Sequence, residues 1–171
     1  TGNGLNLFDW ETELFFRYRH SASATSLSSD NVFSLFIDSE GNLWVGTSAG
    51  LDFLVRQSRS FLHYRHDPSS QTSLSNDTIL SIYEDRGGIL WVGTYGGSIN
   101  TYDQVQDLFQ YYYHSDDFSS LSGNIIFPIF AASHQVVWIG TYGDGLNRFD
   151  METGLFTVYK NDPENPDSLQ N

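Results

Sequence analysis

The chain has 171 residues, with 21 acidic side chains against 8 lysines and arginines, and therefore a formal net charge of −13. Hydrophobic residues make up 39% of it and aromatic residues 16%, which is enough for one packed domain and, with 13 Phe, 10 Tyr and 4 Trp, typical of β-structure. The acidic charge and the lack of a basic run argue against nucleic acid or an anionic membrane as a partner. The absence of cysteine excludes disulfides, thiolate metal sites and cysteine nucleophiles.

A short motif recurs along the chain at a fixed spacing. Trp-Val/Ile-Gly-Thr occupies residues 44–47, 91–94 and 138–141, a step of 47 residues, and Leu-Ser recurs with the same step at 27, 74 and 121. The first residues, Gly4 to Asp9, match Gly145 to Asp150 almost residue for residue. A period of this length indicates a repeat fold, and the chain starts in mid-repeat.

Each repeat contains four expected strands, here called a to d. In the first complete repeat, strand a covers residues 32–37 and is followed by the turn 38–42 and by strand b at 43–47. A Gly-containing turn then leads to strand c at 51–55, and residues 57–60 lead to strand d at 61–65. Four short strands in each 47-residue unit predict an all-β propeller segment of four-stranded antiparallel blades.

The period sets the expected blade boundaries. Residues 1–26 are the second half of a blade, residues 27–73, 74–120 and 121–167 are three blades, and residues 168–171 begin another repeat. These about three and a half blades are too few to close a ring, since propellers have four to eight. We therefore expect a segment of a longer protein whose open blade edges associate with a second copy of the chain.

The repeat resembles a known family. Leu-Ser, a strand, Asp-x-x-Gly-x-Leu-Trp-Val-Gly-Thr, a Gly-rich turn and Leu-Asn-x-Phe-Asp together are similar to the two-component regulator propeller repeat. The resemblance implies an extracytoplasmic or periplasmic ligand-sensing domain of a membrane-anchored bacterial receptor, such as a hybrid histidine kinase or a GGDEF-type diguanylate cyclase. The third repeat departs from this pattern, because residues 131–136 replace the Asp-x-x-Gly turn.

The most regular residues of the repeat have a structural explanation. We expect Trp44, Trp91 and Trp138 to pack between blades, and Gly46, Gly93 and Gly140 to belong to the same structural pattern. The alternative is that the tryptophans form a platform for a sugar, but residues inside a strand seldom reach a ligand. Their regular occurrence is therefore assigned to the fold.

Binding is expected in the loops at one end of the blades, where the b-to-c and d-to-a connections lie together. Tyrosine beside glycine offers a flat ring, a hydroxyl group and close backbone approach, which suits a carbohydrate or another small polar ligand. Capping of turns is the competing explanation for the acidic and amide positions. The candidate ligand-binding residues are Asp30, Asp77, Asn124, Tyr95, Tyr142 and Asp144.

No residues of this sequence indicate a catalytic, cofactor or metal site. His20, His66 and His114 follow the repeat onto separate blades, where they cannot converge on a metal ion. The acidic turns lack the ligand spacing of an EF-hand, and no phosphate-binding or nucleophile motif occurs. We therefore expect a non-enzymatic sensor segment that relays to a module outside this chain. The alternatives are a protein-interaction scaffold and, less favoured, a propeller glycosidase or lyase.

Overall fold

The computed structural model describes residues 2–117, 119–133 and 135–170 and contains only strands and loops there. None of these residues belongs to a helix that could cross a membrane. The strands are β1 (Leu5–Asp9), β2 (Leu14–Tyr18), β3 (Val32–Ile37), β4 (Leu43–Thr47), β5 (Gly50–Val55), β6 (Ser60–Tyr64), β7 (Ile79–Glu84), β8 (Leu90–Thr94), β9 (Ile99–Asp103), β10 (Leu108–Tyr112), β11 (Ile126–Ala131), β12 (Val136–Thr141), β13 (Gly145–Asp150) and β14 (Leu155–Tyr159).

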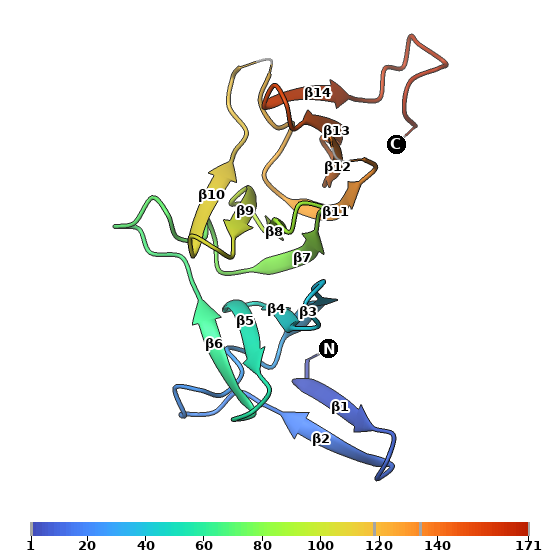
Figure 1. The fold of residues 1–171 in the computed structure, drawn as a ribbon. Coiled ribbons are helices and arrows are strands. Elements are labelled where there is room, and N and C mark those ends of the chain that lie inside the picture. Colours follow the sequence, from blue (N-terminus) through green and yellow to red (C-terminus); the bar gives the residue numbers. More distant parts are fainter. Residues whose placement is uncertain (1, 118, 134, 171) are drawn as a thin grey trace.

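The strands form three four-stranded sheets and one two-stranded sheet, and every neighbouring pair is antiparallel. β3 to β6, β7 to β10 and β11 to β14 are each paired in chain order, while β1 pairs only with β2. Figure 1 shows the sheets following one another, each turned relative to the last. This arrangement confirms the predicted fold class, an all-β propeller segment.

The first strand of each complete blade lies innermost. β3 contacts β7, and β7 in turn contacts β11, while β7 and β11 also touch β4 and β8 of the preceding blade. Glycine in strand b permits this approach. A Cβ atom at Gly46 would lie 2.8 Å from the Ile79 Cγ2, and one at Gly93 would lie 2.7 Å from the Ile126 Cγ2. A side chain at either position would push the neighbouring blade away.

Blade-to-blade packing is built on the tryptophan of strand b. Trp44 is 1% exposed and its ring centroid lies 5.6 Å from that of Tyr102 in the next blade. Trp91 is 2% exposed and lies 5.5 Å from Phe149 in the same way. Trp138 is only partly buried and packs on Tyr159 of its own blade, because no described sheet follows it.

Two of these indoles each donate a hydrogen bond to a buried aspartate of their own blade. Asp38 accepts a hydrogen bond from Trp44 Nε1 at 2.9 Å, and Asp85 accepts one from Trp91 Nε1 at 2.8 Å. Burial opposes the ionised form of Asp38, but hydrogen bonds from Trp44, Asn42 and Glu40 outweigh it and hold the pKa of this carboxyl below its ordinary value of 3.8. In the third blade the equivalent residue is Ala132, so Trp138 has no such acceptor.

Replacing Asp38 by alanine should lower the free energy of unfolding by about 1–3 kcal/mol near neutral pH, because the buried indole N–H loses its acceptor. The loss should shrink as the pH falls, since the depressed pKa means that the carboxylate contributes stability above its unfolded-state pKa and none once it is protonated. Urea unfolding at several pH values measures both effects. Ala132→Asp is the control, and it should not destabilise the chain. An Asp38→Ala cost that is independent of pH would contradict this account.

Candidate functional site

The three candidate residues of the d-to-a connections occupy equivalent places. We call the end of the blades that carries these connections and the b-to-c turns the upper end. One side-chain oxygen of each residue accepts a hydrogen bond from the backbone N–H of a histidine just after the preceding strand d, at 2.7–2.8 Å. Each residue thus fixes the path from one blade to the next, which is a turn-capping role. The pairs are Asp30 with His20, Asp77 with His66 and Asn124 with His114.

The side chains of the same three histidines form a second contact within each d-to-a connection. Their Nδ1 atoms lie 2.6–2.9 Å from the backbone carbonyl oxygens of Leu27, Leu74 and Leu121. A carbonyl oxygen only accepts, so Nδ1 carries the proton and donates it. These rings therefore stabilise the connections between blades. Among the described residues no group of three histidine, aspartate or glutamate side chains could hold a metal ion.

The backbones of Tyr95 and Tyr142 both contact one loop residue, Ile125. Tyr95 forms an isolated β-bridge with Ile125, and the backbone N–H of Tyr142 donates to the Ile125 carbonyl oxygen at 3.0 Å. Phe127, two residues further on, has its ring 6.1 Å from that of Tyr142. The three residues are 56%, 71% and 47% exposed in the order Tyr95, Tyr142, Phe127. We call these three residues the upper aromatic cluster.

Asp144 lies beside this cluster on the turn between β12 and β13. Its carboxylate packs against Gly123, where a Cβ atom would lie 2.9 Å from the Asp144 Cγ. Asp144 and Lys160 also border a hollow of about 580 Å³ at this end of the third blade. Asn124, Tyr142 and Asp144 therefore belong to one surface, whereas Asp30 and Asp77 lie on the crossings into the first and second complete blades.

Sequence reasoning missed a buried polar residue of strand c that holds the d-to-a connection in each complete blade. Asn147 Oδ1 accepts from the Ser122 backbone N–H at 2.8 Å, and its Nδ2 donates to the Ile139 carbonyl oxygen at 3.2 Å. Asn100 makes the same two kinds of contact with Ser75 and Val92. Leu-Ser recurs every 47 residues, and Asn100 and Asn147 are also 47 residues apart. This shared spacing could have revealed the contact.

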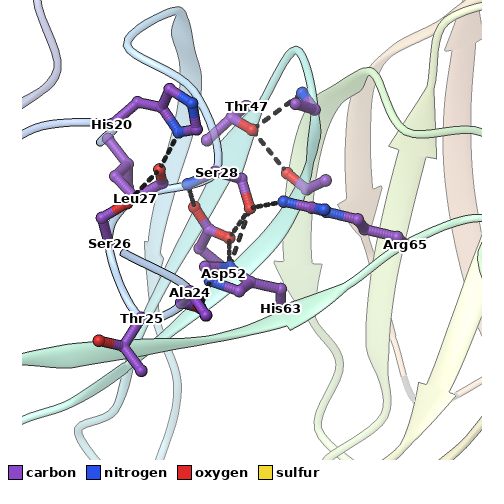
Figure 2. A network of polar contacts seen from close by, with 12 residues as sticks. His20, Ala24, Thr25, Ser26, Leu27, Ser28, Thr47, Asp52, His63 and Arg65 are labelled. Carbon is purple, nitrogen blue, oxygen red and sulfur yellow. Dashed lines mark hydrogen bonds and ion pairs between the residues drawn. The ribbon is translucent and has the colours of Figure 1, made fainter. Parts of the chain in front are cut away.

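The first complete blade carries a different network at this position. Asp52 replaces the asparagine, is fully buried, and accepts from the backbone N–H of Ser28 at 2.8 Å and from its hydroxyl at 2.5 Å. His63 Nδ1 lies 2.6 Å from the same carboxylate and 2.9 Å from Ser28 Oγ. Figure 2 shows these side chains converging from the loop before β3 and from β5 and β6, with Arg65 reaching Ser28 Oγ at 3.4 Å.

Serine, histidine and aspartate are here arranged for structure rather than for nucleophilic catalysis. A catalytic triad places the serine on one ring nitrogen and the carboxylate on the other. Ser28 and Asp52 both face Nδ1 of His63, and Nε2 lies 2.9 Å from the Ala24 carbonyl oxygen. Both ring nitrogens are thus engaged in contacts within the fold, Nδ1 with Asp52 and Ser28 and Nε2 with Ala24. The network anchors the loop that carries Ala24 and Ser28.

Replacing Asp52 by asparagine should lower the free energy of unfolding by about 1–2 kcal/mol, because the amide keeps the contact with the Ser28 N–H but loses the contact of the carboxylate with His63 Nδ1. The amide can accept from Ser28 and donate to the Val45 carbonyl oxygen, as its two counterparts do in the other blades. Asp52→Leu is the matched variant and should cost about 3 kcal/mol or more, because the Ser28 N–H and the His63 ring lose their acceptor. Urea unfolding measures both variants. Equal losses would mean that the carboxylate itself is required.

Comparison with known proteins gives the fold a family context. Residues 26–49 and 73–96 match the model of the two component regulator propeller. The extracellular domain of the hybrid two component system BT3049 from B. thetaiotaomicron superposes with a TM-score of 0.82 at 22% identity, over 94% of this chain and 22% of that one. The corresponding domain of BT4673 from the same organism superposes with a TM-score of 0.76 at 24% identity, over 92% of this chain and 22% of that one. No curated protein matched the chain.

A third solved structure has a different setting. PorZ, a surface component of the type-IX secretion system of Porphyromonas gingivalis, superposes with a TM-score of 0.58 at 15% identity, over 85% of this chain and 19% of that one. The chain spans about a fifth of the length of these structures. At these identities they show the fold, while the match to the repeat model confirms the resemblance seen in the sequence. Residues 26–49 and 73–96 are thus similar to two component regulator propeller repeats, and the chain shares the fold of the extracellular domains of hybrid two component systems.

Proposed function

We propose that this chain is part of the ligand-sensing propeller of a membrane-anchored bacterial signalling receptor, located on the periplasmic or extracytoplasmic side. The observation that carries the proposal is the match to two component regulator propeller repeats, together with the fold shared with extracellular domains of such systems. We assign no enzymatic activity to this segment. A histidine kinase or a diguanylate cyclase of the GGDEF type would belong to a module outside it.

The ligand we propose is a carbohydrate or another small polar molecule bound at the upper end of the blades. Tyr95, Tyr142 and Phe127 expose flat rings there, and the two tyrosines add hydroxyl groups. Gly96 and Gly143, which follow the tyrosines, leave room for close approach, since nothing lies within 4 Å of a Cβ atom at either position. The net charge of −13 favours a neutral ligand over an anionic polysaccharide.

Signalling requires more than binding. A ligand shifts an equilibrium between two blade or dimer arrangements only through different affinities for the two. Asp30, Asp77 and Asn124 connect each upper loop to the end of the preceding strand d, so a ligand on these loops acts on the connections between blades. This is the route by which we propose that occupancy reaches the rest of a receptor.

A protein-interaction scaffold is the second candidate. The same fold in PorZ, which is described as a component of a secretion system, favours it. A receptor and a scaffold differ in what the upper end binds, a small molecule in one case and a polypeptide in the other. A glycosidase or lyase would need two carboxyl groups across a cleft. It is less favoured, because Asp30 and Asp77 each accept a backbone N–H in the connections between blades.

Tyr95→Ala and Tyr142→Ala should each weaken binding of a neutral oligosaccharide about tenfold, because each removes a stacking ring. A glycan array of neutral and acidic oligosaccharides identifies the ligand, and calorimetry measures its affinity. Trp10→Ala is the matched control, since this exposed indole lies on the turn between β1 and β2 at the opposite end. Unchanged affinity in both tyrosine variants, or capture of polypeptides alone, would contradict a carbohydrate site here.

We also propose that the chain self-associates through its open blade faces. Phe8 occupies the strand-c position of Tyr102 and Phe149, which pack on Trp44 and Trp91. Among the described residues its ring contacts are with Trp10 and Phe15 of its own hairpin. At the other end, Trp138 lies on the last sheet of the described residues and is only partly buried. The two ends are therefore complementary, and the indole of one copy would pack on Phe8 of a second copy in a head-to-tail contact.

Trp138→Glu should weaken this association about tenfold or more, because a charge would then enter the apolar contact. Sedimentation across a concentration series measures it. Val105→Glu, a change at an exposed position on the turn between β9 and β10, is the control and should leave association unchanged. A wild-type chain that stays monomeric at high concentration would contradict the proposal.

A further inference from the structure

A cavity lies between the second and third complete blades, away from the upper aromatic cluster. It has a volume of about 290 Å³ and lies among β8, β9 and β10 on one side and β13 on the other. Its lining includes Ile89 and Met151, which lie next to turns at the lower end of the blades, opposite the upper end. Its size is near the lower limit of pockets that hold small organic ligands.

The other interface between complete blades shows what this cavity lacks. In the first blade the residue paired with Trp44 is Phe53, and its ring packs edge-on against the indole with centroids 4.9 Å apart. In the second blade the residue paired with Trp91 is Thr101, which lines the cavity. The repeat thus places a phenyl ring beside one tryptophan and a small hydroxyl side chain beside the next.

A second substitution changes the polar side of the same space. Between the first two complete blades the Tyr64 hydroxyl lies 2.9 Å from that of Tyr102, which donates to Asp107 at 2.6 Å. Between the next two blades Tyr112 faces Phe149, with ring centroids 5.0 Å apart, and Phe149 has no hydroxyl. Burial raises the pKa of Tyr112, so its phenol stays neutral and able to donate. It borders the cavity.

We propose that this cavity binds a small aromatic ligand whose ring takes the place that Phe53 fills in the neighbouring interface and whose polar substituent meets the Tyr112 hydroxyl. Trp91, Phe149 and Met151 supply an apolar lining, and a thioether beside an aromatic ring is a favourable contact. Asp103 is the only charged residue of the lining, which disfavours an anionic ligand. The site is independent of the carbohydrate site proposed above.

The chain offers a single reporter for this site, because Met151 is its one methionine. With a ¹³C-labelled methyl group, Met151 gives one resonance that a bound ring shifts by its ring current. Phenol is the probe, and for so few atoms we expect saturation at about 1 mM. Cyclohexanol, which has a similar size and a hydroxyl but no aromatic ring, should fail to displace phenol. Benzoate should bind more weakly than phenol because of its charge.

Thr101→Phe should fill the cavity and weaken phenol binding at least about tenfold. It should also change the chemical shift of Met151 in the ligand-free protein. Thr101→Leu, a smaller change, should weaken it less and keeps the test valid if the larger side chain prevents folding. Phe53→Thr is the matched control and should leave the Met151 titration unchanged. A shift that never saturates in the wild type, or equal affinity in the wild type and a folded Thr101 variant, would overturn the proposal.

Discussion

Packing of a strand-b indole against the strand-c aromatic residue of the next blade is the interaction on which the rest of the structure depends. A four-stranded antiparallel blade has two apolar faces and cannot bury both alone. Trp44 against Tyr102 and Trp91 against Phe149 supply the cover, and Gly46 and Gly93 let the inner strand of the next blade approach. Because Asp38 and Asp85 accept from the indole N–H groups, the polar atom in each contact is also satisfied.

This packing determines the positions of the upper loops. Each d-to-a connection is held at its start by a histidine and an aspartate or asparagine, and lower down by a buried side chain of strand c. In two blades that side chain is Asn100 or Asn147, while in the first it is Asp52 paired with His63. A loop fixed at both points presents its exposed residues in a defined geometry. This is why the backbones of Tyr95 and Tyr142 both contact Ile125.

The sequence alone was sufficient to predict the fold because the fold is periodic. A step of 47 residues in Trp-Val/Ile-Gly-Thr fixes strand b, and the alternation around it fixes strands a, c and d. The candidate ligand residues were harder to interpret from their positions alone. Asp30, Asp77 and Asn124 occur at equivalent places, and the structure shows each of them hydrogen-bonded to a backbone N–H, a contact between residues about ten positions apart. The Asp52 network joins residues 24 to 35 positions from Ser28, which strand periodicity does not reveal.

The places where single blades depart from the repeat carry the most information about individual sites. A residue that recurs in every blade is explained by the packing that every blade needs, as the tryptophans and glycines are. A residue that differs while its neighbours stay constant alters one interface only, and its effect can be read against the unaltered copy. Thr101 in place of Phe53 and Phe149 in place of Tyr102 remove a ring and a hydroxyl from one interface while the indole and the tyrosine around them remain. A propeller can therefore acquire a binding site when one blade interface loses a side chain, because the unchanged neighbouring residues keep the resulting cavity open.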